Sequence, residues 1–325
     1  MEKQSSPTRD RAIRTQETAD RRKETAIRIE NLTKYYGKIR GIEDVSFQVE
    51  RGEFFGFIGP NAAGKSTTIR SLLGLIRPTT GRAWVLEKEI AQDREAILRQ
   101  VGYLPAENTF YPNMRVQDLL QFSANLRKQD CSHRAAELSE RLQLDTSRKV
   151  DELSSGNRKK AAIVAALQHD PELLILDEPT SSLDPLMQNE FFKILKERHT
   201  QGATIFLSTH ILSEVQTHCR TAAIIRDGKI VAWDKVSNLV QAATKRIHIR
   251  GSVDLNDVQG VMDLKQMNGT LDFFYQGDLK ELLTRLSTSD IKDLRIMEPS
   301  LEEVFLHYYE VDKGDKNATQ VGKGK

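Results

Sequence analysis

The sequence predicts an α/β protein with a parallel sheet, because three short apolar runs are each followed by residues suited to a ligand site. The runs are Glu53–Ile58, Leu173–Leu176 and Thr204–Ser208. Continuous apolar runs of this length are typical of strands that are buried on both faces. In open parallel sheets, ligands bind beyond the carboxyl ends of the strands. The residues that follow the three runs are therefore the candidate site.

The first run leads into a phosphate-binding loop. Its sequence fits the pattern G-x-x-x-x-G-K-[ST], and apolar residues at helical spacing follow from Ser66 to Gly74. In a strand–loop–helix order, backbone N–H groups and the helix N-terminus converge on phosphate oxygens. Lys65 would reach the β- and γ-phosphates, and Ser66 would offer its hydroxyl to Mg²⁺. An ordinary glycine-rich turn is the alternative, but both flanks favour phosphate binding by Gly59, Pro60, Asn61, Ala62, Ala63, Gly64, Lys65, Ser66 and Thr67.

Length and composition bound the rest of the chain. The 325 residues predict about two domains, and 38% hydrophobic residues are enough for packed cores. The 48 basic and 46 acidic residues give a net charge of +2, which does not predict a nucleic-acid-binding surface. Cys131 and Cys219 have neither disulfide nor metal spacing, so we expect reduced thiols in a cytoplasmic protein.

The ends of the chain and its longest apolar stretches do not predict membrane insertion. Residues 1–25 are polar and mixed in charge, so we expect a mobile extension and no signal peptide. The apolar stretch Ala161–Leu167 is far too short to span a bilayer. Any membrane role would therefore require docking onto a partner.

The elements follow in order. Alternation at Ile27 and Ile29, and again over Val45–Val49, predicts half-buried strands. Arg77–Gly81 is a turn before a strand at Ala83–Leu86. Apart from the strand-like Val101–Pro105, the pattern from Arg94 to about Leu167 predicts a helical subdomain. One helix face is expected to carry Leu119, Leu120, Phe122 and Leu126, and another Leu138, Leu142 and Leu144.

The other two apolar runs end in residues that suit ATP hydrolysis. Asp177, at the end of its strand, would contact Mg²⁺ directly or through water, and Glu178 could polarise the attacking water. A strand that ends in two acids is more often only the start of a loop, but this one follows a phosphate loop. A lone histidine is usually structural, yet His210 at a strand end could bond the γ-phosphate or the attacking water.

A further segment, Leu153–Asn157, reads Leu-Ser-Ser-Gly-Asn before a predicted helix. It resembles the signature motif of the ATPase subunits of ATP-binding-cassette (ABC) transporters, usually Leu-Ser-Gly-Gly-Gln. Ser154 and the N–H groups of Ser155 and Gly156 would form a second anion-binding helix N-terminus, with Asn157 beside them. A Ser-Gly turn that caps a helix is the simpler alternative. The resemblance covers about Ala26 to Leu239.

The resemblance implies a fold and roles for further residues. The fold would be a P-loop NTPase of the ABC type, with an antiparallel β-subdomain, a RecA-like parallel core and a helical subdomain. Tyr36 would stack on adenine, and Asp184 would belong to the loop that couples two sites. In the family, each ATP lies between the phosphate loop of one subunit and the signature of the other. A chain with one copy of each motif is thus expected to form a homodimer or to pair with a similar subunit.

The sequence departs from the family pattern at several positions. Ala62, Ser155 and Ser182 stand where glycine is usual, and Asn157 stands where glutamine is usual. An alanine at positive φ would cost about 1 kcal/mol or more. Ala106-Glu107 replaces the glutamine that contacts Mg²⁺, which leaves Glu107 as a candidate substitute. Because Lys65, Ser66, Asp177, Glu178 and His210 remain, we expect hydrolysis to be retained.

Beyond residue 240 the pattern predicts a small α+β domain. Its elements are Ile247–Ile249, Asp254–Val258, Met262–Met267, Leu271–Tyr275, Leu279–Leu286, Ile291–Ile296 and Leu301–Tyr309. The β-α-β-β-α-β order suggests a ferredoxin-like accessory domain over residues 241–310, whose last helix starts at a capping box of Ser300 and Glu303. Residues 311–325 are expected to be disordered. Similar extensions recur in ABC subunits of bacterial exporters.

The motifs and the resemblance predict an ATP-hydrolysing subunit over residues 26–240 that needs ATP and Mg²⁺. It would drive a separate permease, in the export direction, from the inner face of the cell membrane and without nucleic acid. The alternative is a soluble ABC-type ATPase that acts on ribosomes or DNA. Such proteins usually carry two cassettes, a long coiled coil or zinc-binding cysteines, and this sequence shows none of them.

Overall fold

The computed structural model describes residues 24–297, except 112, 242–244, 256, 257, 268, 276 and 288. The described residues form two compact units, which divide between Trp233 and Asp234. The expected boundary after residue 240 falls in helix α9 (Val236–Gln241) of the second unit, and the proposed domain limits stay predictions. The N-terminal extension up to residue 23, the last predicted helix with its capping box, and the C-terminal tail lie outside the described residues.

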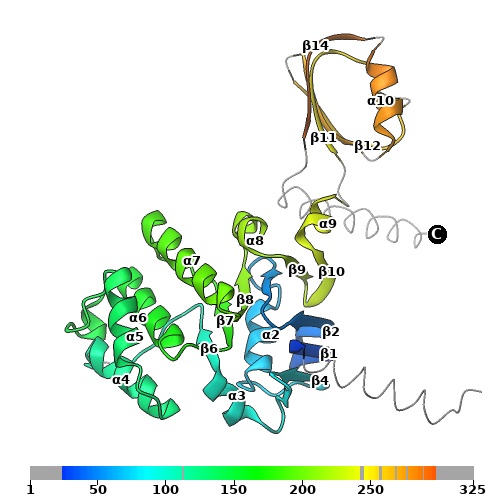
Figure 1. Ribbon diagram of the computed structural model, residues 1–325. Coiled ribbons are helices and arrows are strands. Elements are labelled where there is room, and N and C mark those ends of the chain that lie inside the picture. Colours follow the sequence, from blue (N-terminus) through cyan, green and yellow to red (C-terminus); the bar gives the residue numbers. More distant parts are fainter. Residues whose placement is uncertain are drawn as a thin grey trace, which may run out of the picture. The chain divides into compact units, whose positions relative to one another are not determined.

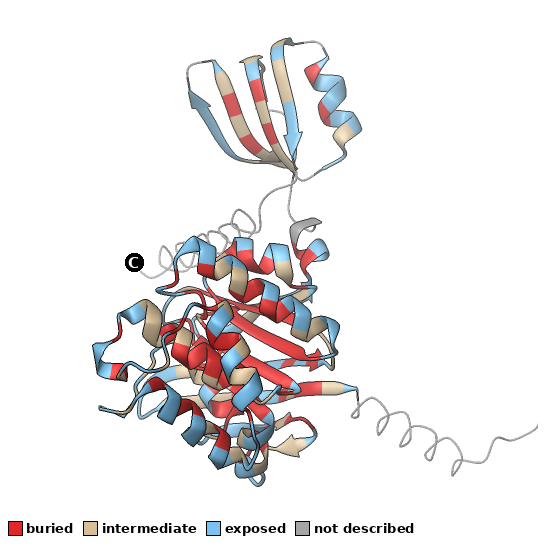
Figure 2. Ribbon diagram, turned by 60° about the vertical axis from the view of Figure 1, so that its left-hand side comes forward, coloured by how far each residue is buried: buried red, intermediate tan, exposed pale blue. Residues whose placement is uncertain are grey.

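A six-stranded sheet forms the centre of the first unit, in the order β10-β9-β3-β8-β7-β6. The three apolar runs are its neighbouring strands β3 (Phe54–Ile58), β8 (Thr204–Thr209) and β7 (Leu173–Asp177), which are parallel to one another. All residues of these three strands are buried, as Figure 2 shows for the middle of this unit. The other strands are β6 (Val101–Leu104), β9 (Thr221–Arg226) and β10 (Lys229–Lys235). The expected parallel core is confirmed.

A second sheet, antiparallel and of four strands, packs beside the first. Its order is β2-β1-β4-β5, with bounds β1 (Thr25–Tyr36), β2 (Ile39–Glu50), β4 (Thr80–Val85) and β5 (Lys88–Glu89). Alternating buried residues of β1 and β2 face the core, as the sequence pattern predicts. Phe47 of β2 stacks on Phe55 of β3 with ring centroids 5.5 Å apart. This aromatic contact joins the two sheets.

Helices pack on the sheets, and two of them, α2 (Lys65–Leu72) and α6 (Ser155–Leu167), begin within the phosphate loop and the signature segment. Helix α2 contacts strands of both sheets, and Figure 1 shows it between them. Helices α7 (Pro185–Thr200) and α8 (Leu212–His218) pack on the six-stranded sheet. The helical subdomain contains α4 (Val116–Arg127), α5 (Ser132–Arg141) and α6, and a short helix, α3 (Arg94–Gln100), precedes β6.

The predicted apolar face of α4 is partly wrong. Leu119 and Leu120 are buried, but Phe122 and Leu126 are exposed by 42% and 59%. The buried stripe of α4 instead runs through Val116, Leu119, Leu120 and Ala124. Phe122 therefore faces outward, where its ring meets Tyr111 edge-on at 6.3 Å. Leu138, Leu142 and Leu144 are all buried. Helix α5 ends at Arg141, however, so the prediction that the three share a helix face is wrong for Leu142 and Leu144.

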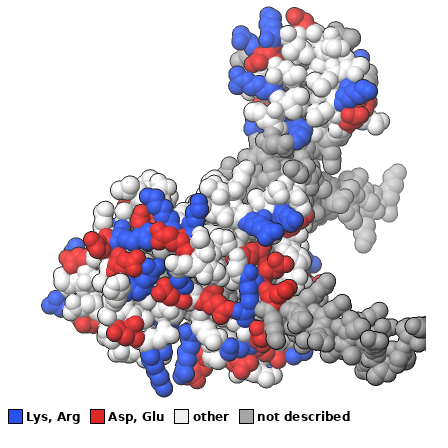
Figure 3. Space-filling view, viewed as in Figure 1, with Lys and Arg blue, Asp and Glu red and all other residues white. Residues whose placement is uncertain are grey.

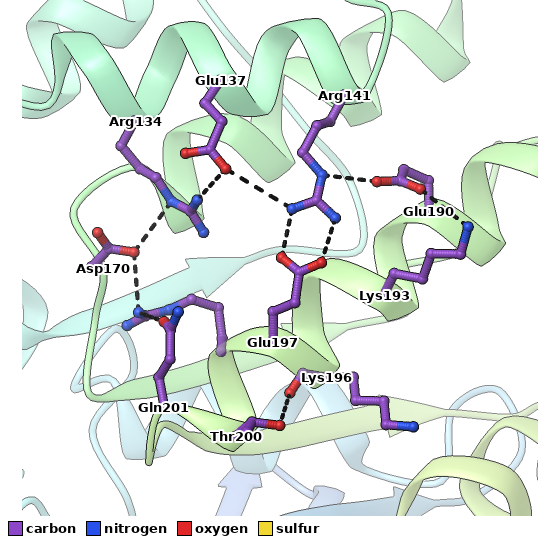
Figure 4. Close-up of polar contacts among 11 residues, drawn as sticks. Arg134, Glu137, Arg141, Asp170, Glu190, Lys193, Lys196, Glu197, Thr200 and Gln201 are labelled. Atoms are coloured by element: carbon purple, nitrogen blue, oxygen red, sulfur yellow. Dashed lines mark hydrogen bonds and ion pairs between the residues drawn. The ribbon is translucent and has the colours of Figure 1, made fainter.

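An ion-pair network joins α5 to α7 within the first unit (Figure 4). Arg141 of α5 makes a two-pronged contact with Glu197 of α7, at 2.6 and 2.8 Å, and its Nε donates to Glu190 at 2.8 Å. Arg134 of α5 and Arg198 of α7 both pair with Asp170. Polar contacts thus connect the helical subdomain to the helix beside the parallel sheet.

Besides α9, the second unit contains a four-stranded antiparallel sheet and, among the described residues, one further helix. The strands are β11 (Lys245–Ser252), β12 (Val261–Met267), β13 (Thr270–Tyr275) and β14 (Asp290–Met297), in the order β12-β13-β11-β14. Helix α10 (Leu279–Leu286) packs Leu282 and Leu286 into a core with Ile247 and Phe273. The predicted helix at Asp254–Val258 is wrong for Asp254, Leu255 and Val258, which lie outside any helix.

Candidate nucleotide-binding site

The phosphate loop joins β3 to α2, as its flanks predict. Gly64 adopts φ 109° directly before α2, and a Cβ there would lie 2.9 Å from the carbonyl oxygen of Gly41. A Cβ on Gly59 would lie 2.5 Å from the carbonyl oxygen of Ile225. Both positions therefore require glycine, because a neighbouring backbone carbonyl lies too close for a side chain. The first N–H groups of α2 have no partner within the helix, and the loop brings them to the end of β3.

Lys65 is buried inside this loop. Its Nζ donates to the carbonyl oxygens of Gly59 at 2.6 Å and Pro60 at 3.1 Å. It also forms an ion pair with Oε1 of Glu178 at 3.2 Å. The side chain is only 6% exposed, so the ammonium group is held by the loop and the end of β7. This places a fixed positive charge where phosphate oxygens would enter.

Ser66 and Asp177 meet although they lie far apart in the sequence. Ser66 donates its hydroxyl to Oδ2 of Asp177 at 2.7 Å, and Ser208 donates to Oδ1 at 2.8 Å. Mg²⁺ in nucleotide sites takes one or two protein oxygens, and the remaining ligands are phosphates and water. The part of the chain that the structure describes contains no cluster of three or more acidic, histidine or cysteine ligands. A hydroxyl and a carboxylate in direct contact thus fit Mg²⁺ that arrives with a nucleotide.

Glu178 lies between a cation and an imidazole. Its Oε2 is 2.7 Å from Nδ1 of His210, and its Oε1 is the atom paired with Lys65. The backbone of Glu178 is left-handed, with φ 47°, and its N–H donates to the carbonyl oxygen of Ser208 on β8. The side chain of His210 is 52% exposed, whereas that of Glu178 is 16% exposed. The predicted acid and histidine therefore form one contacting pair.

The signature segment begins helix α6 at some remove from the phosphate loop. Ser154 is the N-cap, and its Oγ accepts from the backbone N–H of Asn157 at 3.3 Å. A Cβ on Gly156 would lie 2.8 Å from the carbonyl oxygen of Ser182, so this helix start lies against the loop Ser181–Asp184. Among the described residues, no hydrogen bond or ion pair links Ser154–Asn157 to Gly59–Thr67.

Two of the departures from the family pattern lie in left-handed backbone. Ala62 has φ 64° and Ser182 has φ 68°. A side chain in this region costs roughly 1–2 kcal/mol relative to glycine. Ala62 therefore has the positive φ at which an alanine is expected to be less stable than the glycine usual in the family. Ser155, which also replaces a glycine, is the first residue of α6.

Three further candidate residues are Tyr36, Asp184 and Glu107. Tyr36 ends β1 and is 45% exposed, with Nζ of Lys34 5.2 Å from its ring centre. The Oδ1 of Asp184 accepts from the N–H of Met187 and caps α7, which is a structural use of this carboxylate. Glu107 is exposed and follows β6. The proposed ligand roles of these residues stay predictions.

Lys159 was missed by the sequence reasoning. It is 2% exposed on α6, and its Nζ donates to the carbonyl oxygens of Pro105 and Ala106 at 3.2 and 3.3 Å. Burial lowers the pKa of this ammonium group to about 8, although Asp177 and Glu178 oppose the shift. The sequence shows only two successive lysines before the apolar segment that starts at Ala161, and this pattern is equally compatible with exposed side chains.

The face of the first unit that Figure 3 shows is mixed in charge. Figure 3 shows basic and acidic side chains interspersed over the visible face of the first unit, consistent with the net charge of +2. In the described part of the chain, no helix is long and apolar enough to cross a bilayer.

Comparison with known proteins gives consistent matches. Residues 42–181 match the family model described as ABC transporter. The Nod factor export ATP-binding protein I of Rhizobium etli is 31% identical over 87% of this chain and 92% of its own length. The probable multidrug ABC transporter ATP-binding protein YbhF of Escherichia coli is 35% identical over 64% of this chain, but the match spans only 37% of YbhF.

A solved structure described as the ATP-binding subunit of an ABC transporter superposes with a TM-score of 0.64. It is 30% identical in sequence and covers 67% of this chain and 93% of that one. The match includes nearly all of that solved subunit. The fold of the first unit and the names of the sequence relatives therefore indicate the same family.

Proposed function

The chain belongs to the ATP-binding proteins of the ABC transporter family and is an ATPase; from this premise we propose that it binds MgATP between two copies of itself and drives a separate exporter permease. The observation that carries the proposal is the meeting of five side chains at the carboxyl ends of β3, β7 and β8. They are Lys65, Ser66, Asp177, Glu178 and His210.

The first three of these residues would hold the substrate. Lys65 would pair with the β- and γ-phosphates, in competition with its present carbonyl and Glu178 contacts. Ser66 and Asp177 would hold Mg²⁺, with Glu107 as a further candidate. Bound Mg²⁺ would neutralise charge that develops on the phosphate oxygens. Tyr36 would contact the adenine ring from the end of β1.

Glu178 and His210 would act on the attacking water. Glu178 is proposed to orient that water and accept its proton, because its carboxylate lies beside the phosphate loop and is mostly shielded from solvent. His210 holds Oε2 of Glu178 through its Nδ1 and is exposed enough to reach a phosphate oxygen. Phosphate oxygens that attract Lys65 would release the carboxylate for this role.

The start of helix α6, which we propose as a second anion-binding site, supports a dimer. Ser154, Ser155, Gly156 and Asn157 begin α6, and Asp184 lies at the end of the loop that faces them. These residues have no polar contact with the phosphate loop of the same chain among the described residues. We therefore assign them to the ATP held by a second copy, in a head-to-tail homodimer.

A separate permease and the export direction rest on the relatives. The Rhizobium etli protein is named for Nod factor export and aligns over 92% of its length. We propose the same kind of role here, at the inner face of the cell membrane and without a nucleic-acid partner.

Fractionation tests the transport assignment. The full chain is expressed alone and together with a polytopic membrane protein encoded beside it, and the membrane fraction is washed with salt. We expect the chain in the membrane fraction only when the permease is present. Equal membrane association in both cells, or co-purification with ribosomes in place of the permease, would contradict the proposal.

A further inference from the structure

Glu214 is a buried carboxyl group beside the site, and the motifs assign it no role. It lies in α8 and is 8% exposed. The hydroxyl of Thr180 donates to its Oε1 at 2.7 Å, in a buried contact. Within the described residues, its Oε2 is enclosed and has no hydrogen-bond partner. A buried acid that accepts one hydroxyl from another segment calls for an explanation.

The contact joins the two segments that carry Glu178 and His210. Thr180 follows Glu178 by two positions, and α8 starts two positions after His210. The Oγ of Ser181 also donates to the carbonyl oxygen of Glu178 at 2.8 Å. The hydrogen bond between Thr180 and Glu214 therefore connects the segment that follows Glu178 to the helix that follows His210.

The surroundings favour the neutral form of Glu214. Burial raises the pKa of its carboxyl group, and the charge of Glu178 adds to this rise. The hydrogen bond from Thr180, the nearby hydroxyl of Thr209 and His210 oppose it. An ionised Oε2 without a partner would also be costly. A neutral carboxyl group still accepts the Thr180 hydroxyl through its carbonyl oxygen, so this contact does not depend on charge.

The catalytic pair needs such a support. Glu178 has left-handed backbone, a conformation that persists only where neighbouring structure holds it. The side chain of His210 is half exposed, so packing holds its ring on only part of its surface. A displacement of about 1 Å at a reacting group can cost roughly 100-fold in rate.

We propose that Glu214 is a positioning residue for ATP hydrolysis, which accepts the Thr180 hydroxyl and so holds Glu178 in register with His210. The inference rests on the proposed roles of Glu178 and His210. Glu214 does not touch the substrate in this account. Its loss should therefore slow turnover and leave MgATP binding unchanged.

Two substitutions at position 214 separate geometry from charge. Glu214→Met keeps a side chain of similar length and removes the acceptor, and kcat should fall about 10- to 100-fold with unchanged Kd for MgATP. Glu214→Gln keeps a neutral carbonyl acceptor and should retain kcat within about twofold. Equal kcat for Glu214→Met and the parent, or an equal loss in both variants, would overturn the proposal.

The partner residue gives a second test that does not require changing Glu214. Thr180→Val removes the hydroxyl at nearly constant volume and should reproduce the fall in kcat. Adding it to Glu214→Met should cause no further fall, because both changes break the same contact. Additive losses, or parental kcat in Thr180→Val, would overturn the proposal.

A matched control excludes a general effect of losing a buried hydroxyl. Thr204, at the opposite end of β8 from His210, is buried and accepts from the N–H of Gly52 at 2.9 Å. Thr204→Val should therefore keep kcat. If it lowers kcat as far as Thr180→Val does, the position of Thr180 has no special importance and the proposal is wrong.

Glu178→Gln, assayed beside these variants, distinguishes a failure of the proposed role of Glu178 from a failure of the positioning role of Glu214. If it hydrolyses ATP at the parental rate, the proposed role of Glu178 is wrong, and the role of Glu214 is lost with it. If it is inactive while Thr180→Val and Glu214→Met remain fully active, only the inference about Glu214 is overturned.

Discussion

At Lys65, a single ammonium group contacts two loop carbonyl oxygens and the carboxylate of Glu178. Lys65→Ala removes the charge that would pair with the β- and γ-phosphates. We expect tight MgATP binding to be lost while the fold is kept, because the rest of the loop and its glycines remain. Equilibrium titration with a fluorescent ATP analogue measures the affinity, and circular dichroism monitors the fold.

An exposed lysine provides the control for this experiment. Lys229 pairs with Glu43 at 3.1 Å, and its side chain is 55% exposed. Lys229→Ala should leave the affinity for MgATP unchanged. Parental affinity in Lys65→Ala would mean that the loop does not bind phosphate as described.

His169 predicts a dependence of stability on pH. Burial, with smaller contributions from Arg127 and Arg198, lowers its pKa to about 3, whereas an unfolded histidine titrates near 6.5. Between these values the unfolded state binds more protons, so the free energy of unfolding falls as pH falls below about 6.5. The expected slope from this residue is about 1.4 kcal/mol per pH unit within that window.

Urea unfolding at pH 7.5 and pH 5.5 measures this contribution. The parent should lose more stability between the two pH values than His169→Gln, which cannot be protonated. The difference between the two proteins cancels the titration of other groups. Equal losses in both would show that His169 is not held neutral by burial.

The residues that a local motif defines could be predicted from the sequence. Lys65 and Ser66 are fixed by spacing within one loop, and Asp177, Glu178 and His210 follow recognisable strands. Lys159 and Glu214 could not be predicted, because their partners Ala106 and Thr180 are distant in sequence. Their burial depends on how α6 and α8 pack on the sheet.

Among the elements, α5 and α7 are joined by an ion-pair network that links the helical subdomain to the helix beside the parallel sheet (Figure 4). Hydrogen bonds from Arg141 to Glu197, opposed by burial and supported by Glu190, raise the pKa of its guanidinium. Arg141→Met should lower the free energy of unfolding by about 1–2 kcal/mol, because the arginine pairs with Glu137, Glu190 and Glu197 and its contact with Glu197 is two-pronged.

The arginine of an exposed helical pair is the matched control. Arg99 pairs with Glu95 at 2.7 Å, with side chains 51% and 83% exposed. Arg99→Met should cost about 0.5 kcal/mol or less in the same urea titration. If Arg141→Met costs no more than Arg99→Met, the network does not hold α5 against α7.

Periodicity predicted most elements but not every buried face. The strands β3, β7 and β8 could be identified because apolar runs that short cannot form a long amphipathic helix. In α4, apolar Phe122 and Leu126 lie four residues apart and resemble a buried stripe, yet they are exposed. The choice of face depends on which neighbours α4 meets, and a single helix does not encode them.

At the scale of the whole molecule, the described chain forms two compact units, and the proposed site lies in the first. The four strands of the second unit could be anticipated from the alternation of elements, but the helix expected at Asp254–Val258 was wrong for the residues that the structure describes there. Dimerisation is a property of two chains and could only be inferred, from one phosphate loop and one signature segment in each chain.

ATP is proposed to join two copies of the chain, and the Glu178→Gln variant tests this most directly. The substitution keeps the shape of the side chain but removes the carboxylate that would orient water, so hydrolysis should slow by orders of magnitude while binding is spared. Ser154→Arg in the same chain would place a bulky group at the nucleotide interface and should prevent closure. Both proteins can be compared by light scattering with and without MgATP.

The predicted result is a dimer mass for Glu178→Gln with MgATP, a predominantly monomer mass without nucleotide, and a monomer mass for the Ser154→Arg double variant in both conditions. An identical mass for Glu178→Gln with and without MgATP would contradict the shared nucleotide site.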